Sequence, residues 1–136
     1  MMARETNVGI VTRVPHAGGV LDETLKPGME GALEDHRALR RRDWFKWAYT
    51  VYEVIKPLLN GIPGTPGQKA LRFILDSINP HSIVLIAIDP WRLEEYVGTL
   101  NLPALDGGHV EVSMRIHDDM ARYNPELQAT PLVETH

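Results

Sequence analysis

Histidine and acidic residues near the end of the chain are the first candidates for chemistry, because residues of these types bind metal ions. They are His109, Glu111, His117, Asp118 and Asp119. The segment alternates apolar and polar residues and predicts a strand, on which His109 and His117 would lie about 26 Å apart. They cannot share an ion at that separation, and a metal site needs three or four ligands. We therefore expect a solvent-facing surface here and no metal centre.

Asp89 is the second candidate, because it directly follows the apolar run SIVLIAI at residues 82–88. In open α/β sheets, ligands bind beyond the carboxyl ends of the strands, where a carboxylate can act in binding or catalysis. The next residue is Pro90, and an acidic residue before a proline is also a common helix start. The two roles are compatible, so a ligand site near Asp89 remains an alternative interpretation.

The glycine-rich stretch GIPGTPG at residues 61–67 is the third candidate, because it precedes a predicted helix whose amino end could receive an anion. It lacks the lysine of a phosphate-binding P-loop, and it does not match the pattern GxGxxG. No serine stands in a nucleophile elbow either. We therefore expect a protein that is not an enzyme and has no cofactor. A small α/β enzyme or ligand-binding domain is the alternative.

Length, charge and composition are those of one globular domain. The chain has 136 residues, of which 43% are hydrophobic and 24% charged, and its net charge is −4. An overall negative charge disfavours nucleic acid and anionic lipid as partners. The absence of cysteine excludes disulfides and thiolate metal sites. The start MMARETNVGIV has no apolar run of signal-peptide length, so we expect a cytoplasmic protein, or one incorporated in a particle assembled in the cytoplasm.

Hydrophobic periodicity and turn residues predict the order of the elements. The expected elements are a strand at residues 7–14, helices at 32–56 and 65–78, a strand at 82–88, a helix at 89–97 and a strand at 109–117, with a possible edge strand at 101–105. Thr65 and Gln68 have the spacing of a capping box, and the run 82–88 predicts a central strand covered on both faces. The order β-α-α-β-α-β predicts a small α+β or α/β sandwich of helices on a three- to four-stranded sheet.

The segment WFKWAYTVYEVIKPLL at residues 44–59 has an apolar half and a polar half on a helical wheel. Its charged residues and a proline exclude a membrane-spanning helix, which needs about 20 apolar residues. We expect the apolar half to cover the strand at 82–88. The residues expected to be buried together are Trp44, Val51, Ile55 and Ile86. A partner-binding face and a membrane-surface adaptor are the alternatives.

Positive charges cluster around the start of this segment. They belong to Arg37, Arg40, Arg41, Arg42 and Lys46. On a helix these side chains spread around the axis, and acidic residues among them partly neutralise them. A solvated face with local salt bridges explains the cluster, and contact with an acidic partner is the functional alternative. Because the net charge is −4, we expect such a partner to be protein rather than nucleic acid.

The two ends of the chain are interpreted as extended arms around a compact core. The expected parts are an N-terminal strand and arm at residues 1–31, a core at 32–119 and a C-terminal arm at 120–136. The arms hold isolated apolar anchors, which are Val20, Leu21, Leu25, Met29, Leu127, Leu132 and Val133. Sparse anchors on an extended backbone suit grooves on a partner.

These observations favour a structural, non-enzymatic assembly subunit of a larger multiprotein complex, such as a virion, a tail-like apparatus or an accessory subunit. Its partners would be other protein subunits in a homo- or hetero-oligomer. The arms and the basic segment would bind them. Neither a nucleic acid nor a membrane is an expected partner.

Overall fold

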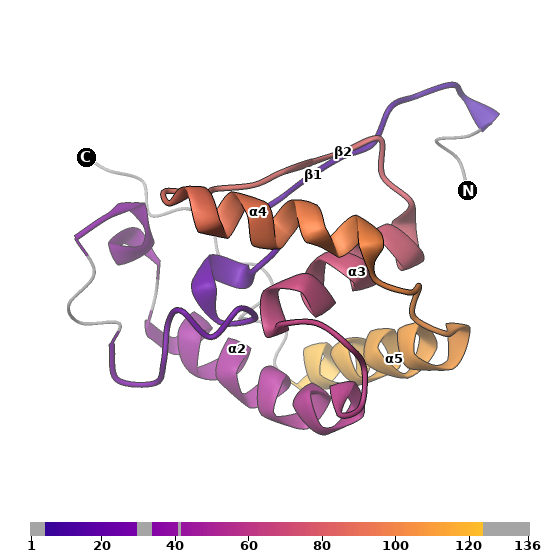
Figure 1. The fold of residues 1–136 in the computed structure, drawn as a ribbon. Coiled ribbons are helices and arrows are strands. Elements are labelled where there is room, and N and C mark those ends of the chain that lie inside the picture. Colours follow the sequence, from indigo (N-terminus) through magenta and orange to yellow (C-terminus); the bar gives the residue numbers. More distant parts are fainter. Residues whose placement is uncertain (1–4, 30–33, 41, 124–136) are drawn as a thin grey trace.

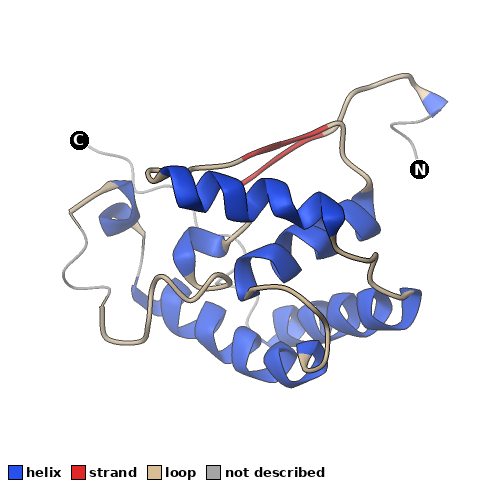
Figure 2. Cartoon of the chain, in the orientation of Figure 1, coloured by secondary structure: helices blue, strands red, loops and turns tan. Residues whose placement is uncertain are grey.

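The computed structural model describes residues 5–29, 34–40 and 42–123 (Figure 1). Its main elements are the strands β1 (Val11–Arg13) and β2 (Ser82–Val84) and the helices α2 (Arg42–Ile55), α3 (Pro66–Ile78), α4 (Pro90–Gly98) and α5 (Gly107–Tyr123). Short 3-10 helices, η1 (Ala17–Gly19), η3 (His36–Leu39), η4 (Lys56–Leu59) and η5 (Thr99–Asn101), lie between them. Helices dominate the described part of the chain (Figure 2). The expectation of a mixed helix and strand fold is confirmed at this coarse level.

Helix α3 lies in the middle of the molecule. α4 and the β1–β2 ribbon lie on one side of it, and α2 and α5 lie on the other (Figure 1). α3 contacts both α4 and α5, and α2 packs along α5. Within the described ranges, none of the helices has the length and apolar character needed to cross a bilayer.

Two helix starts that the turn residues predict are confirmed. Oγ1 of Thr65 accepts a hydrogen bond from the backbone N–H of Gln68 at 3.2 Å, and Oε1 of Gln68 accepts one from the backbone N–H of Thr65 at 3.0 Å. These two bonds complete the capping box of α3. α4 begins at Pro90 directly after Asp89, although the Asp89 side chain makes no capping hydrogen bond. Local backbone chemistry therefore sets both starts.

The strand predicted at residues 109–117 is wrong, because this segment belongs to helix α5. The carboxylate of Asp106 accepts a hydrogen bond from the backbone N–H of His109 at 3.0 Å, which supports the first turn of the helix. At helical spacing Ser113 is buried, whereas Met114, which the strand pattern placed in the core, is 50% exposed. The cap at the start of the segment thus outweighs its alternating pattern.

The sheet is also smaller than predicted. β1 and β2 pair in parallel, with Thr12 opposite Ile83, and they are the only paired strands among the residues that the structure describes. The possible edge strand at 101–105 is absent, because η5 ends at Asn101 and the residues after it are not extended into a ladder. β1 stops early because Val14 has a left-handed φ of 55°, and the proline that follows it has no N–H to donate.

The position of Ile86 contradicts the expected core. Its side chain is 68% exposed, whereas Val51 is 8% exposed and Trp44 and Ile55 are half-buried. The ribbon lies beside α4, on the side of α3 opposite α2 (Figure 1). Helix α2 therefore does not cover the strand, and its apolar face packs elsewhere.

Residues 15–25 pack into the core of the chain and do not form an extended arm. The buried cluster that they share with α2 consists of Val20, Leu25, Phe45, Ala48 and Tyr52. The turn before Val20 requires glycine at position 19, where φ is 103° and a Cβ would lie 2.6 Å from Oγ1 of Thr24. This part of the expected N-terminal arm is therefore an internal layer of the fold.

Replacing Phe45 with alanine should lower the free energy of unfolding by about 3–5 kcal/mol, as large-to-small changes in a core do. Phe45 is 1% exposed at the centre of the buried cluster. Val54→Ala is the control on the exposed side of the same helix, where the side chain is 47% exposed, and it should change stability by no more than about 0.5 kcal/mol. Urea unfolding followed by circular dichroism measures both. Equal costs for the two variants would contradict this packing of α2.

Candidate functional site

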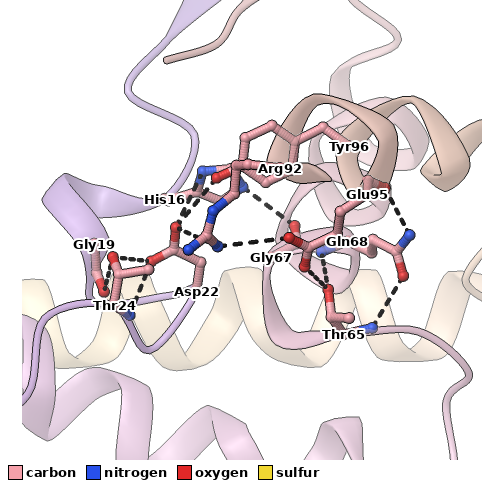
Figure 3. Close-up of polar contacts among 10 residues, drawn as sticks. All are labelled: His16, Gly19, Asp22, Thr24, Thr65, Gly67, Gln68, Arg92, Glu95 and Tyr96. Atoms are coloured by element: carbon pink, nitrogen blue, oxygen red, sulfur yellow. Dashed lines mark hydrogen bonds and ion pairs between the residues drawn. The ribbon is translucent and has the colours of Figure 1, made fainter. Parts of the chain in front are cut away.

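A partly buried network of polar side chains around Asp22 joins three parts of the chain (Figure 3). The Asp22 carboxylate accepts hydrogen bonds from the hydroxyl of Thr24 at 2.7 Å, from the backbone N–H of Thr24 at 3.2 Å and from the hydroxyl of Tyr96 at 3.3 Å. Nδ1 of His16 and Nη1 of Arg92 lie 3.7 and 3.9 Å from its Oδ2 atom. Because the Asp22 side chain is only 6% exposed, these partners replace the water that folding removes.

Glu95 connects the same network to the start of α3. Its carboxylate accepts a hydrogen bond from the hydroxyl of Thr65 and lies 3.5 Å from Nη1 of Arg92. Its backbone carbonyl accepts a hydrogen bond from the side-chain amide of Gln68 at 2.7 Å. The two residues that cap α3 therefore also hold α4 in place (Figure 3).

His16 and Asp22 have the residue types of a general base and its orienting carboxylate. However, Nε2 of His16 lies 3.3 Å from the carbonyl oxygen of Gly67, and its ring stacks on Tyr96 with centroids 4.7 Å apart. Burial lowers the pKa of His16 and outweighs the nearby Asp22 carboxylate, which raises it. Burial also raises the pKa of Tyr96 to about 12. The network therefore supports the fold and does not present these groups to a substrate.

Arginines of the predicted basic segment make contacts within the chain. Arg37 forms an ion pair with Asp35 at 2.7 Å and donates a hydrogen bond to the carbonyl of Gly18 at 3.2 Å. The hydrogen bond to Asp35 raises the pKa of Arg37. The guanidinium of Arg40 lies 4.4 Å from the ring centroid of Trp44, in a cation–π contact. These two arginines are therefore not displayed together as one basic surface.

The other residues expected to bind partners differ in their exposure. Leu25 is 3% exposed and Leu21 packs against the same core, so Leu25 is not available to a neighbouring chain in this conformation. Met29 is 47% exposed, Lys46 is exposed on α2 and Arg42 is the first residue of that helix. The residues that lie outside the described ranges are Arg41, Leu127, Leu132 and Val133.

The residues considered for metal binding all lie on α5, at positions 109, 111 and 117–119. Eight residues of helix separate His109 from His117 by about 12 Å along the axis, so the two are still too far apart to share an ion. Across residues 5–29, 34–40 and 42–123, no three histidine or acidic side chains are placed to hold a metal ion. Asp118 instead lines a cavity that is described below.

Asp89 and the glycine-rich stretch at residues 61–67 are not brought together into a site. Asp89 is exposed, and it does not line the cavity between the helices. The stretch ends in the capping box of α3, where Thr65 already accepts from the first turn of the helix. The alternative of a ligand site near Asp89 therefore gains no support from the cavity or from the glycine-rich stretch.

The β1–β2 ribbon carries an exposed apolar surface. Val11 of β1 is 64% exposed and Val84 of β2 is 52% exposed. Ile86 and Ile88, which follow β2, are 68% and 90% exposed, and Trp91 at the start of α4 is 56% exposed. β1 pairs only with residues 82–84, so among the described strands none lies beside residues 85–88. One face of the apolar run that the sequence predicts in the core is therefore open to solvent, whereas Ile83 and Leu85 are half-buried.

A second apolar feature is a cavity of about 500 Å³ between α2, α3 and α5. The large side chains that line it include Trp44, Trp47, Val51, Phe73, Ile74 and Met114. Lys69 and Asp118 are the charged residues of the lining, and the Lys69 ammonium donates a hydrogen bond to the backbone carbonyl of Leu59 at 3.0 Å. The volume is that of a small-molecule site.

Removing the central carboxylate with Asp22→Ala should lower the free energy of unfolding by about 3–5 kcal/mol, because Arg92 and Tyr96 would lose a buried partner. Glu111→Ala is the control, since Glu111 is 71% exposed and pairs with Arg115 on the surface of α5, and it should cost no more than about 0.5 kcal/mol. Denaturant unfolding of both variants checks this. A wild-type midpoint for Asp22→Ala would mean that the network does not hold the three segments together.

Acidification should destabilise the protein through His16. Because burial lowers the pKa of His16 in the folded state, the unfolded chain binds the proton more readily. The stability that this residue contributes is present above its unfolded pKa of about 6.5 and is lost as the pH falls through its folded pKa. Unfolding of wild type and His16→Gln at pH 7.5 and pH 5.5 measures the difference. The wild type should lose more stability than the variant, and equal losses would contradict the sign.

Comparison with known proteins assigns no family to this geometry. No family model matches the chain, and neither a curated protein nor a solved structure matches it. What the protein does is therefore inferred from its own exposed and enclosed surfaces.

Proposed function

We propose that the protein is a non-enzymatic assembly subunit that binds another protein chain along the β1–β2 ribbon. The observation that carries this proposal is the exposure of residues 82–88, a run without any charged residue whose Ile86 and Ile88 side chains are 68% and 90% exposed. Contiguous exposed apolar residues on a folded domain mark an interaction surface. Covering this run would desolvate no charged side chain, and it would remove several large apolar side chains from water.

The backbone of the ribbon supports the same proposal. Proteins protect the edges of their sheets with charges, prolines or a covering element, and residues 82–88 hold neither a charge nor a proline. Parallel strands are normally buried on both faces, and a two-stranded ribbon is marginally stable by itself. A strand added beside residues 85–88 would satisfy the backbone groups there and cover the side chains.

We infer that the partner is a second copy of this chain. Two-fold pairing would place residues 82–88 antiparallel to the same residues of the other copy, so that no like charges would oppose each other in the uncharged run. The product would be a four-stranded sheet, which is a common size, and two-fold dimers are the commonest oligomers. Such a joint would also allow the protein to be part of a larger particle, such as a virion or a tail-like apparatus.

The oligomeric state in solution tests the proposal. Sedimentation equilibrium should show the wild type as a dimer, and Ile86→Lys should weaken dimerisation by more than about tenfold because it places an unpaired charge in the joint. Val112→Lys is the matched control, since Val112 is 41% exposed on α5, on the other side of α3. It should dimerise like the wild type.

Two results would overturn the proposal. One is a wild type that stays monomeric at every concentration. The other is a dimer that Ile86→Lys leaves intact while Val112→Lys disrupts it, which would move the joint to α5. Circular dichroism of both variants shows that they are folded before the masses are compared.

A further inference from the structure

We infer that the cavity between α2, α3 and α5 is a binding site for an uncharged aromatic small molecule. Its volume of about 500 Å³ lies within the range of ligand pockets and is many times the space that a water molecule fills. Protein interiors are otherwise packed with few voids larger than a water molecule. Because apolar walls bind water poorly, an apolar ligand is the occupant that this lining favours.

The walls of the cavity favour a small molecule over an entering helix. α2, α3 and α5 form three sides, and Pro15, Ala17 and Leu21 of the N-terminal segment contribute to a further side. A helix-binding groove is long and open, so that anchors at successive turns can enter it. Leu59 of η4 also lines the space, which is therefore surrounded by chain on several sides and open to solvent on the remainder, a shape that suits a compact occupant.

The chemistry of the lining favours an uncharged ring system. Trp44, Trp47, Tyr52 and Phe73 bring four aromatic side chains to the lining, and aromatic rings prefer offset-stacked or edge-to-face partners. A charged group in the interior would lose its hydration without a counterion in the apolar part of the wall. The lining charges have opposite signs, with Lys69 also held by a backbone carbonyl, so they select no charged ligand.

This site is separate from the proposed joint. The ribbon lies on the α4 side of α3, and the cavity is lined by the elements on the other side (Figure 1). None of the residues 82–91 contributes to the lining. Ligand binding and dimerisation can therefore be tested one without the other.

The test uses N-phenyl-1-naphthylamine, an uncharged aromatic probe whose fluorescence rises in apolar surroundings, with the full-length protein. Fluorescence should saturate at one probe per chain. In amide proton–nitrogen NMR spectra, the shifts caused by the probe should gather at residues of the lining such as Ala48, Ala70 and Ser113. Shifts gathered at residues 82–88, or a signal that does not saturate, would overturn the site.

Matched substitutions localise the probe. Ala70→Phe adds a ring to the cavity wall and should weaken probe binding by more than about tenfold, whereas Thr50→Phe adds the same ring at an exposed position of α2 and should leave binding unchanged. If Ala70→Phe does not fold, the wild-type NMR map decides. Cross-relaxation between cavity residues and residues 124–136 in the free protein would also overturn the proposal, because the chain itself would then fill the space.

Discussion

The buried carboxylate of Asp22 is the constraint on which the rest of the structure depends. Residues 15–25 turn through several left-handed positions, among them Ala17 with a φ of 49° and Glu23 with a φ of 60°, which non-glycine residues adopt at some cost. The hydrogen bonds and charges around Asp22 offset that cost and tie the segment to α4, and Nε2 of His16 lies 3.3 Å from the carbonyl oxygen of Gly67 in α3. In this position Val20 and Leu25 pack against the apolar face of α2. A polar network on one side of the segment thus determines the apolar packing on the other.

The predictions from sequence succeeded where capping residues mark a helix start, and they failed where an alternating pattern competed with a cap or where the partners are remote in the chain. The capping box at Thr65 and the helix after Asp89 depend on residues within one turn, and both helices begin as expected. The alternation at residues 109–117 also predicts a strand locally, but the cap at Asp106 favours a helix. No local pattern identifies Asp22 as the centre of a network, because its partners Arg92 and Tyr96 belong to α4 and are brought to it only by the fold. The network therefore could not be predicted from periodicity or spacing.

For residues 82–88, the argument that they need cover was correct, but the predicted position beneath α2 was wrong. An apolar run such as 82–88 does need cover, but the sequence cannot say which surface provides it. α2 instead buries Phe45 and Val51 against other parts of the chain, and Ile88 remains 90% exposed. Residues 82–88 still need cover, because α2 does not provide it. This unmet requirement is the reason for placing the partner at the ribbon rather than at the N-terminal segment, whose Leu25 is already buried.

The cavity forms because small residues occupy positions where three helices face one another. Ala48 of α2, Ala70 of α3 and Ser113 of α5 all line it, and Ser113 is only 5% exposed. Larger side chains at these three positions would fill the space, since the surrounding backbone is held by contacts between α2 and α5 and between α3 and α5. The N-terminal segment that Asp22 positions adds Ala17, another small residue, to the same lining. The volume of the cavity thus follows from the size of the side chains at positions where contacts between helices hold the backbone.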